Sequence, residues 1–390
     1  MRKLRFGVVG VGGMGSGHAN AMKNVEDIEL TAVCDIDRKV CDRVASEYKV
    51  RGFTSYESLI DSSLVDAIVV ATPHYYHAPV SIYAMKNGIH VLCEKALAVT
   101  VKAADDMVRA AKENNVKFAV DYQTRSIPEY RAVRRLIESG RLGEIYRTCC
   151  IDTYFRSQAY YDSADWRGTW KGEGGGVLIN QAPHFIDILV SLGGLPSKVL
   201  GFTNTRRHNI EVEDQATAFL TYKNGATGIY HTSTTEYPGT NYVELCGEKG
   251  KILFQEDEHG DKLRFWTLDH PVQEFSDKGS QMWGQPSAHE ETVPLEKREG
   301  AVSRWDPAPI IRNLARAILY DEPLLSPGEE GALSVEFIDA VILSGKSGKP
   351  VEIPVDRNEY EKFIEELKRT SKGKAVKENE RVTDPTLTKA

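Results

Sequence analysis

The stretch from Leu4 to Asp35 contains the pattern that most restricts how this chain can fold. An apolar run over residues 6–9 enters the turn Gly10-Val11-Gly12-Gly13-Met14-Gly15, and a helix is expected over residues 17–24. A second apolar run, over residues 28–34, stops at Asp35. Strand, glycine turn, helix and strand, with an acidic residue about 20 positions after the turn, are typical of a βαβ unit that binds a dinucleotide.

The residue types in this turn suit a bound pyrophosphate. Gly10 permits a sharp turn, Gly12 lets a pyrophosphate approach the backbone, and Gly15 lets the helix pack closely on the strand. The N-terminus of the helix supplies N–H groups and a partial positive charge for the phosphates. We therefore predict that the following residues bind the cofactor: Gly10, Gly12, Gly13, Met14, Gly15, Asp35, Ile36 and Arg38.

The end of the second strand favours NAD as that cofactor. The carboxylate of Asp35 is placed to accept hydrogen bonds from both hydroxyls of an adenosine ribose, and it repels a 2′-phosphate. Arg38 leaves NADP open as the second choice, because its guanidinium can stack on adenine or accommodate the phosphate.

Composition and charge exclude several classes of protein. The net charge of −7 implies no basic surface for nucleic acid. No apolar run approaches the roughly 20 residues of a membrane span, and the first strand begins too early for a signal peptide. The six cysteines show no metal-ligand spacing, so we expect reduced thiols and no metal. These observations predict a cytoplasmic protein without nucleic-acid or membrane partners.

The order of the expected elements divides the chain into two domains. Strands and helices alternate over residues 1–124, which predicts an α/β Rossmann domain with a parallel sheet. Longer β-type runs dominate residues 125–370 and predict an α+β domain with a large, mainly antiparallel open sheet for substrate binding and oligomerisation. We expect residues 257–304 to form a poorly periodic excursion, and residues 371–390 to form a flexible tail.

One segment with chemical potential follows a strand of the first domain. Glu94-Lys95 comes directly after the strand expected over residues 90–93. Ligands bind at the carboxyl ends of parallel strands, so these side chains are expected beside the nicotinamide. From the residues alone, a surface lysine with a neighbouring glutamate is an equally good interpretation.

A second such segment opens a helix of the second domain, expected over residues 178–192. Asn180, His184 and Asp187 are spaced i, i+4 and i+7, which places them on one face of that helix. Pro183 belongs in the first turn of a helix or marks a kink. The spacing is equally consistent with a histidine made more basic by its neighbours and with a buried structural histidine satisfied by Asp187.

Taken together, these motifs resemble the glucose–fructose oxidoreductase, inositol dehydrogenase and MocA (Gfo/Idh/MocA) family. The resemblance rests on the glycine turn with Asp35, the T-P-x-x-x-H run at residues 72–77, Glu94-Lys95 and the GGG…H-x-x-D helix, in register from residue 4 to about residue 355. It implies an NAD-dependent oxidoreductase that transfers a hydride between a secondary ring hydroxyl of a sugar, glycoside or cyclitol and the nicotinamide. It also implies a homodimer or homotetramer.

The resemblance implies roles for individual residues. Lys95 and His184 would form the catalytic pair, with Asn180 beside them. His184, with a pKa near neutrality, suits a general base, and cationic Lys95 suits a developing alkoxide. Further cofactor contacts would come from Thr72, Pro73, His74, His77, Glu94, Lys95 and Gln123. Substrate contacts would come from Lys95, Arg125, Tyr154, Arg156, Trp166, Arg167, Asn180 and His184.

Two positions depart from the family pattern. Ala96 stands where the family usually has proline, and a cis bond before a non-proline residue costs about 2.5–4 kcal/mol, so we expect a trans Lys95–Ala96 bond. Asn180 stands where aspartate is common and cannot accept a proton, which leaves His184 as the base and predicts a pH-dependent limb near neutrality.

Two other functions compete with the dehydrogenase. A relative of this fold can keep NAD bound and use transient oxidation of a sugar to cleave a glycosidic bond. The chain is also compatible with a non-catalytic dinucleotide sensor. Net NADH formation distinguishes the dehydrogenase from both.

Overall fold

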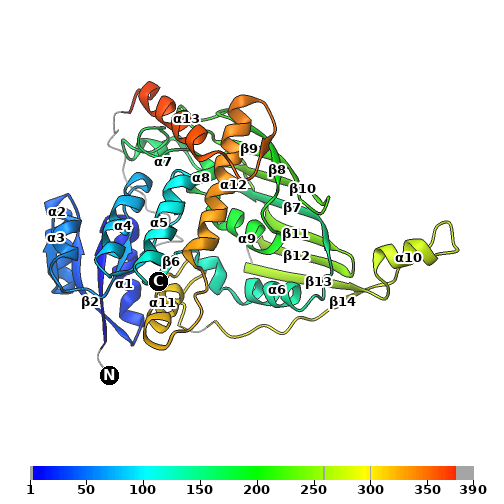
Figure 1. Ribbon diagram of the computed structural model, residues 1–390, viewed down its shortest axis with the longest axis horizontal. Helices are drawn as coiled ribbons and strands as arrows, with labels where there is room; N and C mark the ends of the chain where they lie inside the picture. The colour runs from blue at the N-terminus through cyan, green and yellow to red at the C-terminus, as the bar shows by residue number, and fades with distance from the viewer. Residues whose placement is uncertain (1–2, 258–259, 299, 375–390) are drawn as a thin grey trace.

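A computed structural model describes residues 3–257, 260–298 and 300–374 of the chain (Figure 1). The first domain contains a parallel sheet in the order β3-β2-β1-β4-β5-β6, as expected for a Rossmann fold. Its strands are β1 (Leu4–Val9), β2 (Ile28–Cys34), β3 (Arg51–Phe53), β4 (Ala67–Val70), β5 (His90–Cys93) and β6 (Phe118–Val120). Its helices are α1 (Gly13–Ala21), α2 (Arg38–Tyr48), α3 (Tyr56–Ile60), α4 (His77–Lys86) and α5 (Val101–Glu113), with short 3₁₀ turns η1 (Met22–Asn24) and η2 (His74–Tyr76).

Local side-chain chemistry explains where several of these helices begin. The Asp37 carboxylate accepts from the backbone N–H groups of Lys39 and Val40 and caps α2. Ser55 caps α3 and Thr100 caps α5 in the same manner. The caps at Asp37 and Ser55 are those expected from the sequence. The short edge strand β3 is not expected from it.

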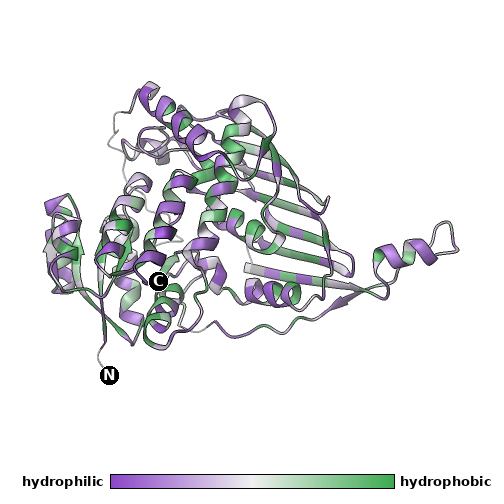
Figure 2. Cartoon of the chain, viewed as in Figure 1, coloured by the Kyte–Doolittle hydropathy of each residue, from purple (hydrophilic) through white to green (hydrophobic). Residues whose placement is uncertain are grey.

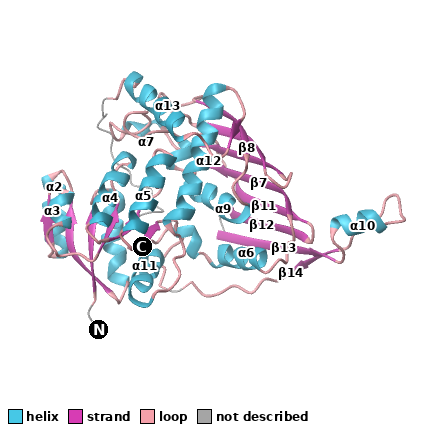
Figure 3. Cartoon of the chain, in the orientation of Figure 1, coloured by secondary structure: helices cyan, strands magenta, loops and turns pink. Residues whose placement is uncertain are grey.

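The second domain contains a sheet in the order β14-β13-β12-β11-β7-β10-β9-β8-β15 (Figures 1 and 3). Its strands are β7 (Ile145–Thr153), β8 (Lys198–Asn204), β9 (Gln215–Thr221), β10 (Thr227–Ser233), β11 (Asn241–Gly247), β12 (Gly250–Asp257), β13 (Gly260–Leu268), β14 (Ala288–Glu291) and β15 (Val351–Glu352). Within the described chain, β7 and β10 run parallel and the other neighbours run antiparallel, which confirms the expected fold class.

Helices cover one face of this sheet, and its strands alternate between hydrophobic and hydrophilic residues (Figure 2). The cross-strand row Ala218, Tyr230, Cys150 and Val243 is buried on the helix side. The accompanying helices and turn are η3 (Gln123–Ser126), α6 (Pro128–Glu138), α7 (Gln158–Asp162), α8 (Val177–Asn180), α9 (Pro183–Gly193), α10 (Val272–Lys278), α11 (Ala308–Tyr320), α12 (Gly328–Ser347) and α13 (Arg357–Thr370).

Two late helices tie the domains together. α11 packs in one hydrophobic cluster with residues of the first domain, so this part of the 125–370 segment lies against the Rossmann sheet. α12 contributes Val335 to a cluster of the first domain and Phe337 to the core of the second. The Asp339 carboxylate accepts from the Val101 N–H at 2.7 Å, which fixes α12 to the start of α5.

Three expectations about local structure need correction. The helix expected over residues 178–192 is divided into α8 and α9, because Pro183 has no N–H to continue a helix and instead begins the next one. The segment 257–304 is more regular than expected: it contains β13, α10 and β14, and α10 projects from the body of the molecule (Figure 1). Of the predicted tail, residues 371–374 contact the second domain, for example through Ser371 to Glu211 at 2.5 Å, and residues 375–390 lie outside the described part.

No helix in the described part of the chain is long and apolar enough to cross a membrane.

Candidate active site

The glycine turn between β1 and α1 forms an open cradle for phosphate groups. Gly10 has a φ of 86°, and a Cβ atom at Gly15 would lie 1.8 Å from the Gly10 carbonyl oxygen, so both positions require glycine. A Cβ at Gly12 or Gly13 would meet nothing within 4 Å. No side chain caps α1 at Gly12, which leaves the N–H groups of its first turn directed at this space.

The carboxylate of Asp35 is held beside this cradle. Its Oδ2 accepts from the Val11 N–H at 3.0 Å, and its Oδ1 accepts from the Asp37 N–H at 3.0 Å. Ile36 is 92% exposed and Met14 58% exposed, and Arg38 begins α2 directly after this segment. These residues therefore fit a dinucleotide whose diphosphate lies on α1 and whose adenosine ribose lies against Asp35.

Two histidines that follow β4 contact protein atoms rather than open space. His77 is fully buried, with Nδ1 2.8 Å from the Ala96 carbonyl oxygen and Nε2 2.8 Å from the Thr72 carbonyl oxygen. His74 Nδ1 lies 3.1 Å from the Glu173 carbonyl oxygen, and burial lowers the pKa of His74 to about 3. Thr72 and Pro73 remain partly exposed at the strand end, whereas His77 positions the Ala96 segment. The expectation that His77 contacts the cofactor is therefore corrected.

Glu94 belongs to a buried cluster behind the glycine turn. His18 Nε2 lies 2.7 Å from Glu94 Oε1 and 3.5 Å from Asp121 Oδ2. Burial opposes ionisation of Glu94, but the hydrogen bond and charge of His18 lower the Glu94 pKa to about 2. Burial raises the pKa of Asp121 well above its usual range. Gln123, expected at the cofactor, donates its side-chain N–H to Asp121 and is 3% exposed, so it serves this cluster.

Lys95 lies between the two domains. Its Nζ donates to the Asn180 carbonyl oxygen at 2.6 Å, and its backbone N–H donates to Glu94 Oε2 at 3.1 Å. The Lys95–Ala96 bond is cis, so the expectation of a trans bond is wrong. Burial lowers the Lys95 pKa, and the charge of Glu94 acts in the opposite direction.

His184 is the second residue of α9 and faces the same site. Its ring lies 5.0 Å from that of Trp305 and 6.0 Å from that of Tyr122. Burial, followed by the charge of Lys95, lowers the pKa of His184 to about 3. Its Nδ1 has no hydrogen-bond partner among the described residues, so Asp187 does not orient the ring. The sequence predicts that activity falls near neutral pH as His184 becomes protonated. Because the pKa of His184 is lowered, we do not attribute such a fall to this residue.

Asn180 ends α8, and because a new helix begins at Pro183, Asn180 is not part of the helix that carries His184. Its backbone oxygen contacts Lys95, whereas its side-chain N–H group donates to Glu173 Oε1. Glu173 is buried, which raises its pKa, and its Oε2 accepts from the Gly168 N–H. Asn180 thus links the ammonium group to a carboxyl group that the sequence does not indicate.

An aromatic and cationic cluster borders the site on the side of the second domain. The Arg167 guanidinium carbon lies 4.5 Å from the centre of the Tyr160 ring and 4.3 Å from that of Trp166. Arg156 lies 5.4 Å from the Tyr160 ring and 5.8 Å from the Tyr154 ring. The predicted substrate residues Arg156, Trp166 and Arg167 are thereby brought together with Tyr160, and the charges of both arginines act on Lys95.

The two halves of the chain match two domains of one known family. Residues 4–122 match its NAD-binding Rossmann fold, and residues 130–253 match its C-terminal domain. The chain belongs to the Gfo/Idh/MocA oxidoreductase family. Its first domain is therefore an NAD-binding domain, and the protein is an NAD-dependent oxidoreductase.

Individual relatives of this Gfo/Idh/MocA protein cover most of its length. Inositol 2-dehydrogenase of Rubrobacter xylanophilus is 38% identical over 256 residues, which are 64% of this chain and 71% of the relative. The 2,7-anhydro-N-acetylneuraminate hydratase of Escherichia coli is 28% identical over 286 residues, 70% of this chain and 75% of the relative. The crystal structure of the WlbA dehydrogenase from Bordetella pertussis, in complex with NADH and UDP-GlcNAcA, superposes with a TM-score of 0.75 at 28% identity over 91% of this chain and all of that chain.

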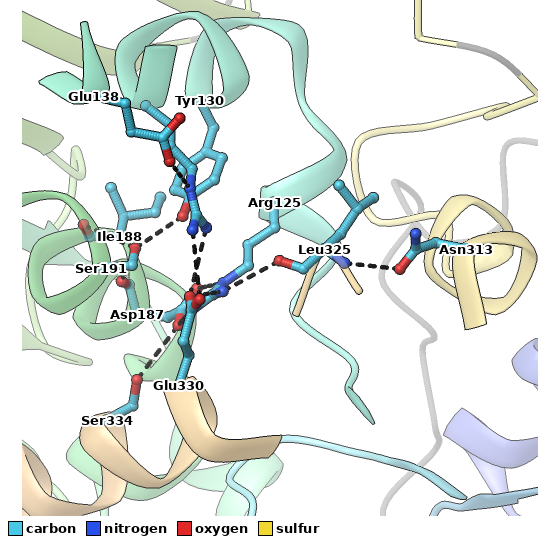
Figure 4. A network of polar contacts seen from close by, with 11 residues as sticks. Arg125, Tyr130, Glu138, Asp187, Ile188, Ser191, Asn313, Leu325, Glu330 and Ser334 are labelled. Carbon is cyan, nitrogen blue, oxygen red and sulfur yellow. Dashed lines mark hydrogen bonds and ion pairs between the residues drawn. The ribbon is translucent and has the colours of Figure 1, made fainter. Parts of the chain in front are cut away.

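In contrast to the expectation that it binds substrate, Arg125 of this Gfo/Idh/MocA protein is buried in a polar network with Asp187 and Glu330 (Figure 4). It is 1% exposed, and its guanidinium donates to both oxygens of Asp187, at 2.6 and 2.8 Å. It also contacts Glu330 and donates to the Leu325 carbonyl oxygen at 3.2 Å. Arg125 therefore joins η3, α9 and α12, and it fixes the helix that carries His184.

Tyr154 also differs from its expected place. Its hydroxyl is buried near Asp152 and Glu256, and burial raises its pKa well above the usual range. Its ring supports Arg156, so we assign it to the wall behind the cluster rather than to a direct substrate contact.

Several residues at the site are missed by sequence reasoning. Arg304 ends the 257–304 segment and Trp305 directly follows it, and the charge of Arg304 acts on His184. His18 occupies an ordinary position inside α1, and Asp121 follows β6. The strand-end position of Asp121 is a usable signal. No spacing or motif connects Trp305 or His18 to the Lys95 segment.

Proposed function

We propose that this protein transfers a hydride between a secondary ring hydroxyl of a sugar, glycoside or cyclitol and NAD, with Lys95 and His184 as the catalytic pair. The observation that carries the proposal is the approach of the two side chains from different domains. Lys95 Nζ is bound to the carbonyl oxygen of Asn180, four residues before His184, and its charge acts directly on the His184 ring.

The two groups have complementary chemistry for alcohol oxidation. NAD, when bound, supplies the hydride acceptor. His184 is neutral at physiological pH because burial and Lys95 disfavour its protonated form, so it is in the right state to take the hydroxyl proton. The ammonium of Lys95 stabilises the negative charge that develops on the carbinol oxygen.

The lining of the site supports a polyhydroxylated substrate. Trp166, Trp305 and Tyr160 offer aromatic faces, and Arg156 and Arg167 offer hydrogen-bond donors. Pockets for sugars combine such faces with a few placed polar groups. The relatives named above act on an inositol or an anhydro sugar or bind a nucleotide sugar, which agrees with this class.

A screen of sugars, inositols and glycosides for NAD⁺ reduction, followed at the NADH absorption, tests the proposal. On the best substrate, Lys95→Ala and His184→Ala are each expected to lower kcat by about 10²–10⁴-fold. Lys102→Ala and His289→Ala change exposed residues of the same types and serve as controls. Near-normal turnover in either active-site variant, with NADH binding intact, contradicts the assignment.

A redox-neutral reaction is the second candidate, because a relative at 28% identity is a hydratase. The same pair of groups can then act on a transiently oxidised sugar, as also required for NAD-assisted glycoside cleavage. Product analysis separates the candidates. Net NADH accumulation supports the dehydrogenase, and conversion of the sugar without net NADH supports the second reaction.

We further propose that the protein is a homo-oligomer. The sheet face away from the helices exposes Phe219 on β9 and Ile229 on β10, which are cross-strand partners, at 55% and 43%, and Phe202 on β8 at 50%. A contiguous apolar surface of this kind on a sheet is suited to a symmetric partner.

A further inference from the structure

Two arginines at the site are held by aromatic rings and form no ion pair with any carboxylate in the described part of the chain. Arg167 lies between Tyr160 and Trp166, and its Nη1 donates to the Tyr160 hydroxyl at 2.7 Å. Arg156 lies beside the other edge of this cluster, and its Nη1 donates to the Phe155 carbonyl oxygen at 2.8 Å. Neither forms an ion pair with a carboxylate among the described residues, and both are only half-buried. Their remaining N–H groups are therefore available to a ligand.

Several other arginines that stack on aromatic rings in this protein have an acidic partner, among them Arg264 and Arg316. Arg264 lies 4.3 Å from the Trp266 ring and is bound by both oxygens of Glu290. Arg316 lies 5.3 Å from the Tyr320 ring and pairs with Glu322. Arg156 and Arg167 therefore stack on aromatic rings as Arg264 and Arg316 do. They differ because no glutamate or aspartate among the described residues pairs with them.

The acidic groups near the site are already engaged. Glu94 pairs with His18 at 2.7 Å. Glu173 accepts from the Gly168 N–H through Oε2 and from the Asn180 amide through Oε1, so both of its oxygens are already engaged. Lys95, Arg156 and Arg167 therefore leave the site with an excess of positive charge, which favours a ligand that carries negative charge.

Hydrogen bonds connect this charge to the proposed reacting centre. The Tyr160 hydroxyl contacts Arg167 at 2.7 Å and Asn180 Nδ2 at 3.3 Å, and the Asn180 carbonyl oxygen accepts from Lys95 Nζ. A substituent bound by the arginines would thus lie on the same molecule as a hydroxyl near Lys95.

We propose that Arg156 and Arg167 bind an anionic substituent of the sugar, a carboxylate or a phosphate ester. This inference rests on the proposed function, since the anion is part of the oxidised sugar. A guanidinium binds either group through two parallel hydrogen bonds, and aromatic stacking holds it in place for that contact.

Equilibrium binding to the enzyme loaded with NADH tests the proposal without turnover. Calorimetric titrations compare glucose, galactose and N-acetylglucosamine with their uronic acids, the neutral uronamides and the 6-phosphates. At least one anionic sugar is expected to bind about tenfold or more tightly than its neutral counterpart, a preference that decreases as salt is raised. Comparison of the uronic acids with the 6-phosphates shows whether the site prefers a carboxylate or a phosphate ester. A panel in which no anionic member binds more tightly than its neutral counterpart overturns the proposal.

Substitutions of Arg156 and Arg167 test whether these two residues cause the preference for anionic over neutral sugars. Arg167→Met and Arg156→Met are each expected to reduce the ratio of the affinity for the anionic sugar to that for its neutral counterpart by about tenfold, and Arg167→Lys is expected to have an intermediate effect. Arg264→Gln, which changes a stacked arginine remote from the site, is the matched control. Thermal melting and NADH binding establish that each variant folds. An equal loss for neutral and anionic sugars contradicts the proposal.

The binding measurements and the NAD⁺ reduction assay together distinguish failure of this inference from failure of the proposed function. Preferential binding of anionic sugars without any NAD⁺ reduction supports the subsite and contradicts the redox assignment. NAD⁺ reduction on neutral sugars, without preference for an anion, supports the redox assignment and overturns the subsite.

Discussion

At the scale of single residues, one of the two groups proposed for catalysis influences the protonation of the other. The ammonium of Lys95 disfavours a second positive charge on His184, and the surrounding Tyr122 and Trp305 rings exclude water from the imidazole. A neutral imidazole beside a cationic lysine is the arrangement that oxidation of an alcohol requires.

The lowered pKa of His184, about 3, predicts the pH dependence of oxidation. A histidine with an ordinary pKa of about 6.5 would be lost as a base when the pH falls from 8 to 5. Because the pKa of His184 lies below this window, protonation of His184 should not reduce kcat/KM there. A pH profile of wild type and of His184→Gln tests this, and an acid limb near pH 6.5 that is present in wild type and absent from the variant contradicts it.

We expect Asp35 to set the choice of cofactor through its carboxylate. Asp35→Asn retains an oxygen for the Val11 N–H but removes the charge that repels a 2′-phosphate. We expect the ratio of kcat/KM for NAD⁺ to that for NADP⁺ to fall by about 10–100-fold, the effect of one charge-assisted hydrogen bond. Asp42→Asn changes an exposed carboxylate of the adjacent helix and is the control. An unchanged ratio contradicts this role.

At the scale of elements, the glycine turn depends on contact between α1 and β1. Gly15→Ala places a methyl group against the Gly10 carbonyl oxygen, so α1 must move. We expect a loss of about 1–3 kcal/mol in stability and weaker NADH binding. Gly17→Ala in the same helix meets nothing within 4 Å and should instead stabilise by about 0.5–1 kcal/mol. Thermal melting and NADH fluorescence measure both, and equal behaviour of the two variants would refute the packing argument.

The Arg125 network connects three elements through buried charges. Arg125→Met leaves the fully buried Asp187 without its partner, so we expect a loss of about 3–5 kcal/mol in the free energy of unfolding. Arg109→Gln removes an exposed pair on α5 and should cost less than about 1 kcal/mol. Urea unfolding compares the two variants. A small effect of Arg125→Met would show that Asp187 is neutral or hydrated.

At the scale of the whole molecule, the active site exists only where the domains meet. α12 packs into the cores of both, and its Asp339 and Glu330 bind residues of other elements. Lys95 from the first domain and His184 from the second thereby lie near one another, since Lys95 Nζ donates to Asn180, four residues before His184.

The outer sheet face belongs to the same scale. Phe219→Glu introduces a charge at the centre of the exposed apolar row, so we expect the oligomer to dissociate toward the monomer. Leu319→Lys, which replaces an exposed apolar residue of α11, should leave the mass unchanged. Light scattering coupled to gel filtration measures the mass. A monomeric wild type contradicts the proposed oligomer.

Local patterns in the sequence were sufficient for much of the fold. The βαβ unit, the caps at Asp37 and Ser55, and the two-domain division follow from short-range hydrogen bonds and from the periodicity of apolar residues. Pro183 was visible as a helix breaker, but whether it bends or divides the helix depends on packing around α8 and α9. β13 and β14 were missed because their polar residues gain stability only by joining an existing sheet.

The sequence by itself determined the nucleotide-binding turn, since the geometry of a phosphate cradle is set by residues adjacent in the chain. Only the tertiary structure decided which charges meet. Arg125 and Asp187 pair with each other, whereas Arg156 and Arg167 have no acidic partner within residues 3–257, 260–298 and 300–374. The physical reason is that the energy of a charge depends on its burial and on neighbours distant in sequence, and both are set only when the domains pack together.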